Sequence, residues 1–323
     1  MNWPLWIVPV ILVAAALIVG HRRYTESIPG TPTFRRFPTG TCEAPTQAAV
    51  PRVLWSYWHS AELPLVVSQC LENWAHHNPG YAIHLVNAAN FSQFVDAADL
   101  PSAFARASPA RQSDWMRLYL LHRYGGIWLD ASIILTRSLD WLIDGQRTHG
   151  AEFAGFYLDR YTVRPDDPII DSWCLAAPEG SRFIADWYRE LNDEALRLGD
   201  AAYLARLEAE GQLVHLRQNI ADPAYLIIHM CAQRVLHRNA VSSYRLALTR
   251  AEDSAYYYQS LSNWRRPRLY ARLLLWRHPL QPAPLIKLRG GERRKLEAYL
   301  RHGRYRRDSL VGRQLANIQE TPR

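Results

Sequence analysis

The chain of 323 residues has few cysteines, and no two of them are closely spaced. Cys42, Cys70, Cys174 and Cys231 form no C-x-x-C pair, which argues against a zinc ribbon and against a dense disulfide framework. We expect free, buried thiols, compatible with a reducing compartment, although four thiols could also form two bridges. Internal repeats and low-complexity tracts are absent too. This length therefore suits one large α/β domain with attachments.

Acidic residues are scarce towards the C-terminus. From Trp264 to Arg323 there are 16 Lys and Arg residues against 4 Asp and Glu residues, a local charge of +12. The whole chain carries +8, so the preceding 263 residues carry −4, the difference between the two. This asymmetry predicts an anionic surface or a phosphate-bearing ligand as partner. Nucleic acid is not predicted, because the arginines are interleaved with a membrane-like apolar face.

One long apolar run lies at the N-terminus, from Trp3 to Gly20. Its 18 uncharged positions are about the minimum for a helix that crosses a ~30 Å hydrocarbon core, so we expect a single-pass membrane anchor. A cleaved signal peptide is the alternative, but no Lys or Arg precedes the run and no small-x-small cleavage site follows it. His21, Arg22 and Arg23 follow directly, which predicts a cytoplasmic main domain. A lumenal domain behind a Golgi-type anchor would need the opposite charge bias.

Composition divides the chain into four parts. A stretch rich in Pro, Thr, Gly and Ala reads as a linker, and Trp264 to Trp276 combines helical apolar spacing with arginines, as expected of a helix lying on an anionic membrane. The predicted parts are the anchor with its basic flank (1–23), the linker (24–50), the main domain (51–263) and a basic, membrane-associated C-terminal region (264–323).

Strands and helices alternate in the main domain. Runs of β-branched and aromatic residues indicate strands, and apolar residues three or four apart indicate helices. The order strand, helix, strand predicts a mostly parallel α/β sheet flanked by helices. The predicted strands are 52–58, 81–86, 127–135, 153–157 and 173–177, and the predicted helices are 64–77, 109–124 and 181–198.

A single carboxylate, Asp130, interrupts the apolar strand 127–135. A charge in such a place costs several kcal/mol of desolvation unless the strand ends there or a cation pairs with it. Asp114 and Arg117 are three residues apart on helix 109–124 and therefore share a face, from which they could pair or reach Asp130. An exposed structural pair is the alternative. Asp130 is the residue whose position most needs a functional explanation.

Two adjacent glycines, Gly125 and Gly126, follow helix 109–124. The first is explained as the cap of the helix. The second would let the backbone pass close to a ligand or to a neighbouring helix.

Four short motifs occur in one order: V-P-R-V-L-W-S-Y-W, N-P-G-Y, S-D-W-x-R and Y-G-G-I-W-L-D. Together they resemble the capsular polysaccharide synthesis proteins, which are related to the DXD-containing sugar transferases of the GT-A fold. The similarity covers about Pro51 to Asp140 and continues more weakly to Leu288. It implies a GT-A-like (Rossmann-like) domain and a hexosyltransferase. Such an enzyme would move a sugar from a nucleotide-sugar donor to a growing cell-surface polysaccharide, glycolipid or lipid-linked saccharide.

The resemblance also implies roles for particular residues. Asp114 and Arg117 would hold the donor sugar and diphosphate, and Asp130 would be the first Asp of the DXD metal motif. Lys287 would meet the leaving diphosphate, with a solvated tail charge as the alternative. The remaining residues expected near the donor nucleotide are Ser56, Tyr57, Trp58, Gly125 and Gly126.

A divalent cation is expected at Asp130, because Mn²⁺ and Mg²⁺ take oxygen ligands. Many sugar transferases have a second Asp where this chain reads Asp130-Ala131-Ser132. Ser132 or Asp253 would then have to complete the site. The alternative function is a non-catalytic glycan- or nucleotide-binding subunit of a polysaccharide assembly complex. The sequence leaves open the donor, the acceptor and whether the sugar's configuration is retained.

Overall fold

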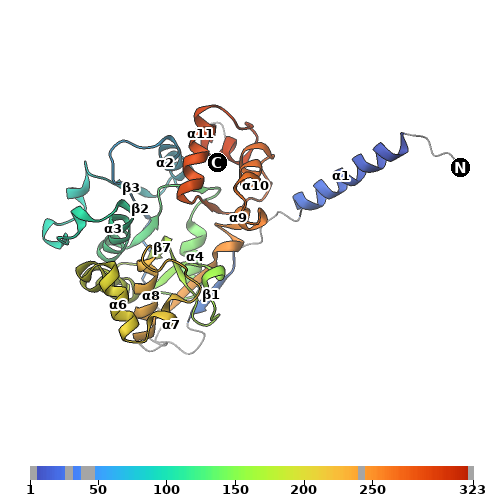
Figure 1. Ribbon diagram of the computed structural model, residues 1–323. Helices are drawn as coiled ribbons and strands as arrows, with labels where there is room; N and C mark the ends of the chain where they lie inside the picture. The colour runs from blue at the N-terminus through green and yellow to red at the C-terminus, as the bar shows by residue number, and fades with distance from the viewer. Residues whose placement is uncertain (1–5, 26–31, 38–47, 239–243, 319–323) are drawn as a thin grey trace.

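A seven-stranded mixed sheet forms the centre of the molecule in this computed structural model, which describes residues 6–25, 32–37, 48–238 and 244–318 (Figure 1). The strand order is β1-β8-β6-β7-β4-β2-β3. The strands are β1 (Phe34–Phe37), β2 (Val53–Tyr57), β3 (Ala82–Val86), β4 (Gly126–Leu129), β6 (Phe153–Tyr157), β7 (Ile170–Ala177) and β8 (Leu246–Arg250); β5 (Ile133–Leu135) and β9 (Leu285–Lys287) form a second, two-stranded sheet.

The α/β class is confirmed, but the prediction of a mostly parallel sheet was wrong. β2 runs parallel to β3 and β4, and β6 runs parallel to β8. β7 lies antiparallel between β4 and β6, and β1 is antiparallel to β8. The reversed β7 matters for the site, because it brings the start of β7 beside the end of β4.

Helices cover both faces of the sheet. Alternation along β2 sends Trp55 to the core under α3, α5 and α8, and Leu54 to the core under α2, α4 and the C-terminal helices. The helices are α1 (Ile7–Thr25), α2 (Leu65–His77), α3 (Pro109–Tyr124), α4 (Asp140–Thr148), α5 (Arg182–Arg189), α6 (Asp200–Ala209), α7 (Leu213–Arg217), α8 (Ile227–Arg238), α9 (Tyr257–Leu261), α10 (Arg266–Tyr270) and α11 (Gly290–Arg301), with π-helical turns η5 (Glu190–Leu196), η7 (Ala271–Leu275) and η8 (Gly312–Ala316).

The predicted helices 64–77 and 109–124 are confirmed as α2 and α3, and the predicted helix 181–198 is α5 continued by η5. α3 begins where the Ser108 hydroxyl accepts a hydrogen bond from the Arg111 amide (3.2 Å). The predicted strand 127–135 is two strands in different sheets, β4 and β5, separated at Asp130. The prediction of one continuous strand was therefore wrong, because the chain turns at the carboxylate.

The two flanking regions are more integrated than predicted. The range expected to be a linker contains β1, which pairs with β8 along the edge of the sheet. In the basic C-terminal region, β9 pairs with β5. The expected membrane-lying helix from Trp264 to Trp276 is instead α10 and η7. Leu269, Tyr270, Leu273 and Leu274 are buried in the core, so most apolar side chains of this stretch pack against the protein, and its contact with a membrane stays a prediction.

The apolar N-terminal run forms α1, but the predicted single-pass anchor was wrong. In the described residues, no helix is both long enough and apolar enough to span a membrane. Of the predicted free thiols, Cys70, Cys174 and Cys231 are confirmed as free and buried; Cys42 lies outside the described residues.

Candidate active site

A cavity of about 370 Å³ lies where β4 ends and β7 begins. Its walls come from α3, β7, α8 and the segment that joins β9 to α11. Three helices begin there, because Ala110, Ile228 and Gly290 from the first turns of α3, α8 and α11 line the cavity. The unpaired amides of helix N-termini carry partial positive charge. The three helix N-termini therefore favour a negative charge at this end of the cavity.

Asp130 leaves β4 at the cavity, where its amide donates to the carbonyl of Trp173 in the antiparallel β7 (2.9 Å). Lys287 Nζ lies 2.5 Å from Asp130 Oδ2, and Arg117 Nη2 lies 3.2 Å from Asp130 Oδ1. Burial opposes ionisation of the carboxyl group, but Lys287 and Arg117 outweigh burial and lower the pKa of Asp130. Asp130 therefore lies where β4 ends and is paired with two cationic side chains, and both features reduce the cost of a charge at this position.

The predicted pair on α3 is buried rather than exposed. Asp114 accepts from Arg111 (2.7 Å) and from Arg117 (3.0 Å), and Arg117 also donates to the Ser172 hydroxyl. Burial raises the pKa of Asp114, and Arg117 and Arg111 act against that rise. Arg117 therefore links Asp114 to Asp130 within one network, and both acids line the cavity with it.

A histidine and a carboxylate that the sequence did not single out contact each other in the wall of this cavity. His229 on α8 lies with Nε2 3.2 Å from Asp171 Oδ1, and both side chains are buried. None of the described residues forms a hydrogen bond with the buried Nδ1 atom of His229. The only sequence signal was one histidine within the apolar start of α8, so the pair becomes visible only when β7 and α8 are packed together.

A strained turn shapes the rim of the cavity. Asn263 and Trp264 have φ angles of 50° and 57°, which non-glycine residues rarely adopt outside functional or over-determined sites. This turn places the Trp264 ring 5.2 Å from the guanidinium of Arg289, and Arg160 lies 4.5 Å from the same ring. The stacking fixes Arg289, which lines the cavity one residue before α11.

The residues predicted to contact the nucleotide lie outside the lining of this cavity. The Ser56 hydroxyl is buried and donates to the carbonyl of Leu129 (2.6 Å), and the Tyr57 hydroxyl donates to Gln112 (2.9 Å). The Trp58 ring carries Arg293 above it at 4.8 Å. These contacts join β2 to its neighbours, and their predicted role at the donor stays a prediction.

Gly125 and Gly126 serve packing in this structure. Both have positive φ angles, 62° and 103°. A Cβ on Gly125 would lie 2.5 Å from the amide of Glu179, and one on Gly126 would lie 2.7 Å from the carbonyl of Val53. The close backbone approach predicted for Gly126 is present, and its neighbours are Val53 and Trp55 of β2.

The residues predicted to bind a divalent cation do not fit one in this arrangement. Both oxygens of Asp130 are taken by Lys287, Arg117 and the Trp128 indole. The Ser132 hydroxyl is buried against the carbonyl of Leu288, and Asp253 pairs with Arg250. A cation at Asp130 would have to displace the ammonium group of Lys287.

A family model described as capsular polysaccharide synthesis protein matches residues 37–193. The match confirms the resemblance that the four motifs predicted. It includes the cavity residues from α3 and β7, and it stops before His229 and Lys287.

The curated relatives that the chain matches are glycosyltransferases. O-glycosyltransferase braB of Annulohypoxylon truncatum is 29% identical over 42% of this chain, and O-glycosyltransferase PaGT of Phomopsis amygdali is 30% identical over 51%. The matches cover 35% and 43% of the two relatives, so the chain spans about two fifths of their length. Among solved structures, the ligand-free glycosyltransferase domain of the YGT toxin shows 10% identity and a TM-score of 0.40 over 79% of this chain and 90% of that domain.

Proposed function

We propose that this chain is a glycosyltransferase that moves a hexosyl group from a nucleotide-sugar donor to a hydroxyl of a saccharide or lipid-linked saccharide. The observation that carries the proposal is the convergence of three helix N-termini with Arg117, Lys287 and Arg289 on one cavity. Helix N-termini and basic side chains are the groups that bind phosphates. A diphosphate is the charged part of such a donor.

Lys287 and Arg289 are the groups we assign to the departing diphosphate. Both residues precede the N-terminus of α11, and both line one wall of the cavity. Charge grows on the diphosphate as the bond to the sugar breaks, so fixed positive groups there stabilise the transition state more than the ground state. Asp130 holds Lys287 in place (2.5 Å) until the anion arrives.

Arg117 and Asp114 on α3 are assigned to the donor sugar and the adjoining phosphate. Their network is rigid, because Arg117 contacts Asp114, Asp130 and Ser172 and stacks 5.3 Å from the Trp128 ring. Side chains that are held in this way lose little freedom when they bind a ligand. The network therefore orients the sugar at low entropic cost.

His229 is assigned the proton of the acceptor hydroxyl. Asp171 accepts from Nε2 (3.2 Å), so the neutral ring carries its proton on Nε2 and leaves the Nδ1 lone pair without a partner. The oxygen of the acceptor would bond to the anomeric carbon, the bond from that carbon to the diphosphate oxygen would break, and Nδ1 would take the hydroxyl proton. Residue Tyr256 also lines the cavity; burial and the nearby Asp171 and Asp130 raise its pKa, so the phenol stays a hydrogen-bond donor.

The experiment that tests the proposal uses the only two lysines of the chain, Lys287 and Lys295. Purified full-length protein is screened against nucleotide sugars for release of the nucleoside diphosphate, with and without saccharide acceptors. We expect Lys287→Met to lower turnover of the active donor by at least about 100-fold. Lys295→Met is the matched control, because Lys295 stacks on Tyr299 outside the cavity lining.

Nucleotide binding without turnover of any donor would instead support a non-catalytic subunit of a polysaccharide assembly complex. Equal turnover by the two variants would contradict the role of Lys287. Thermal unfolding of each variant separates loss of chemistry from loss of folding.

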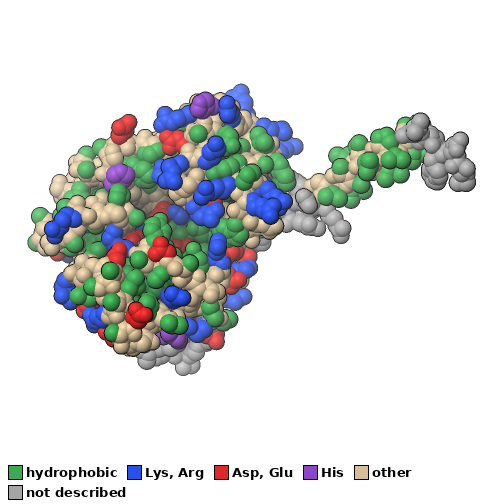
Figure 2. Space-filling model, viewed as in Figure 1, with side chains coloured by type: hydrophobic (Ala, Val, Ile, Leu, Met, Phe, Trp, Pro, Cys, Tyr) green, Lys and Arg blue, Asp and Glu red, His purple; other side chains and the backbone are tan. Residues whose placement is uncertain are grey.

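We further propose that the protein works at the cytoplasmic face of a membrane. Leu275, Trp276 and Leu280 are 53%, 40% and 92% exposed, and Lys and Arg side chains gather over the neighbouring α10 and α11 (Figure 2). Apolar side chains beside basic ones suit an anionic lipid surface. The exposed apolar side chains of α1, from Val8 to Val19, provide a second contact.

A further inference from the structure

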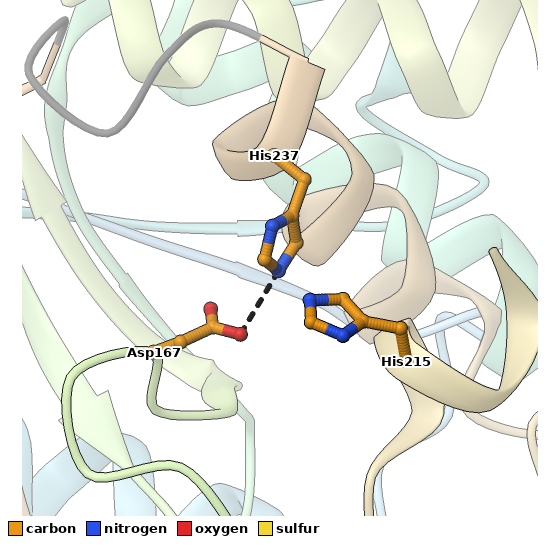
Figure 3. A group of neighbouring side chains, drawn as sticks. All are labelled: Asp167, His215 and His237. Carbon is orange, nitrogen blue, oxygen red and sulfur yellow. Dashed lines mark hydrogen bonds and ion pairs between the residues drawn. The ribbon is translucent and has the colours of Figure 1, made fainter.

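A second cluster of titratable side chains lies outside the cavity, where the loop before β7 meets α7 and the end of α8. Asp167, His215 and His237 each offer one ligand atom, and these atoms lie within 4.8 Å of one another (Figure 3). They come from three segments of the chain and point towards a common centre. We propose that they bind one divalent transition-metal ion of the zinc class.

The ligand set selects the kind of ion. Two imidazole nitrogens with one carboxylate oxygen suit zinc and its neighbours among the transition metals, whereas magnesium and calcium prefer oxygen ligands throughout. Three protein ligands leave the fourth tetrahedral position to water. His215 and His237 are exposed enough for an ion to enter from solvent.

The loop that carries Asp167 is fixed to the helix that carries His215. Gln218, at the end of α7, donates from Nε2 to the carbonyl of Asp167 (2.7 Å) and accepts from the amides of Val163 (2.6 Å) and Arg164 (3.0 Å). To do so it adopts a φ of 45°, a conformation that a residue with a side chain enters only when its surroundings hold it there. Two of the three ligands are therefore preorganised.

The third ligand is placed by a row of contacts along one face of α8. His229, Gln233 and His237 are spaced by four residues and so share that face. They contact in turn Asp171 (3.2 Å), the carbonyl of Pro168 (2.8 Å) and Asp167 (2.9 Å). α8 thus runs back along the start of β7, with His237 at its far end.

Arg164 is compatible with an ion at this place. It donates from Nε (3.1 Å) and Nη2 (2.7 Å) to Asp167 Oδ2 and from Nη2 to the carbonyl of His215 (2.8 Å). Metal-binding carboxylates are commonly hydrogen-bonded in this way. The ion would take the position of the proton between His237 Nε2 and Asp167, and the neutral ring of His237 would carry its proton on Nδ1.

The site is distinct from the candidate active site. His237 follows His229 by eight residues, about 12 Å along α8, and none of the three ligands lines the cavity. An ion there would tie α7, α8 and the loop before β7 together, and so would hold the helix that positions His229. The inference does not depend on the proposed reaction.

The test uses tag-free, full-length protein that has been stripped with a chelator and is titrated with Zn²⁺ by calorimetry and with Co²⁺ by visible absorption. We expect one equivalent to bind and Co²⁺ to give the intense bands of a four-coordinate site. His215→Ala and His237→Ala should each weaken binding at least about tenfold. His302→Ala, which removes an exposed histidine at the end of α11, should bind as the wild type does.

Hydrogen exchange provides a second readout, because Zn²⁺ should slow exchange in residues 213–238 of the wild type and not of His237→Ala. Asp130→Asn should keep the full equivalent, which separates this site from any ion at the cavity. The proposal is overturned if no stoichiometric binding occurs, if both histidine variants bind as the wild type does, or if Asp130→Asn alone removes binding. In any of these cases, Asp167 would contact only His237 and Arg164, and no ion would be bound between them.

Discussion

His229 and Asp171 are close only because two distant segments meet. Asp171 stands at the start of β7 and also accepts hydrogen bonds from the Ser172 amide (2.8 Å) and from the Trp173 indole. These donors keep the carboxylate oriented towards α8. A buried carboxylate with several donors is well suited to fix the tautomer of a histidine ring.

At this residue scale we predict that His229→Asn lowers the rate of sugar transfer by about 10²- to 10⁴-fold at neutral pH. His229 would take the acceptor proton, so the variant should lose turnover while it keeps its affinity for the donor. The measurement is kcat/KM at neutral pH together with the Kd of the donor, with the donor and acceptor found by screening. His122→Asn is the control, because His122 stacks on Tyr188 away from the cavity. An unchanged kcat/KM in His229→Asn would rule out the role.

At the scale of elements, local patterns predicted β2, β3, β6, α2 and α3 correctly, because each carries its own apolar periodicity and its own end signals. The placing of β4 and β5 in different sheets could not be predicted, since both strands are wholly buried and only the segment at Asp130 separates their apolar runs. What separates them is the pairing of β5 with β9, about 150 residues further along the chain. The reversed direction of β7 has the same origin in long-range pairing.

The residues of the candidate site also differ in whether the sequence could predict them. Asp114, Arg117, Asp130 and Lys287 were found from family motifs, and the structure brings all four together at the cavity. Arg289 and His229 carry no local signal, because their importance depends on a strained turn at Trp264 and on the packing of α8 against β7. Gly125 and Gly126 stood out in the sequence, and in this structure neither position has room for a Cβ.

The junction of α3 and β4 gives the prediction at this scale. Gly126→Ala should destabilise the protein by about 2–4 kcal/mol, since φ is 103° and the new Cβ would lie 2.7 Å from the Val53 carbonyl. Urea unfolding of the variant and wild type measures the difference. Gly80→Ala is the control, because its φ is not positive and a Cβ there would meet no atom within 4 Å. Equal losses in both variants would contradict this account.

At the scale of the whole molecule, charge and exposed apolar surface are unevenly distributed. The net charge of +12 from Trp264 to Arg323 is carried by a region that packs into the main body. Arg265, Arg268 and Arg277 of this region are exposed, and so is the apolar Leu280. The C-terminal region therefore supplies Lys287 and Arg289 to the cavity and presents a basic surface outside it.

This surface leads to the last prediction. Full-length protein should sediment with vesicles that contain phosphatidylglycerol, and Leu280→Glu should weaken that binding because it places a carboxylate next to anionic lipid. Deletion of residues 1–20 should weaken it further by removing the apolar side chains of α1. Raising the salt concentration should weaken the remaining binding of the deleted protein, since exposed charges are screened within about 10 Å at 0.1 M. Val214→Glu is the matched control, because Val214 is 79% exposed on α7, outside the basic region. Equal loss of binding in the two glutamate variants would show that net charge, rather than this surface, governs the contact.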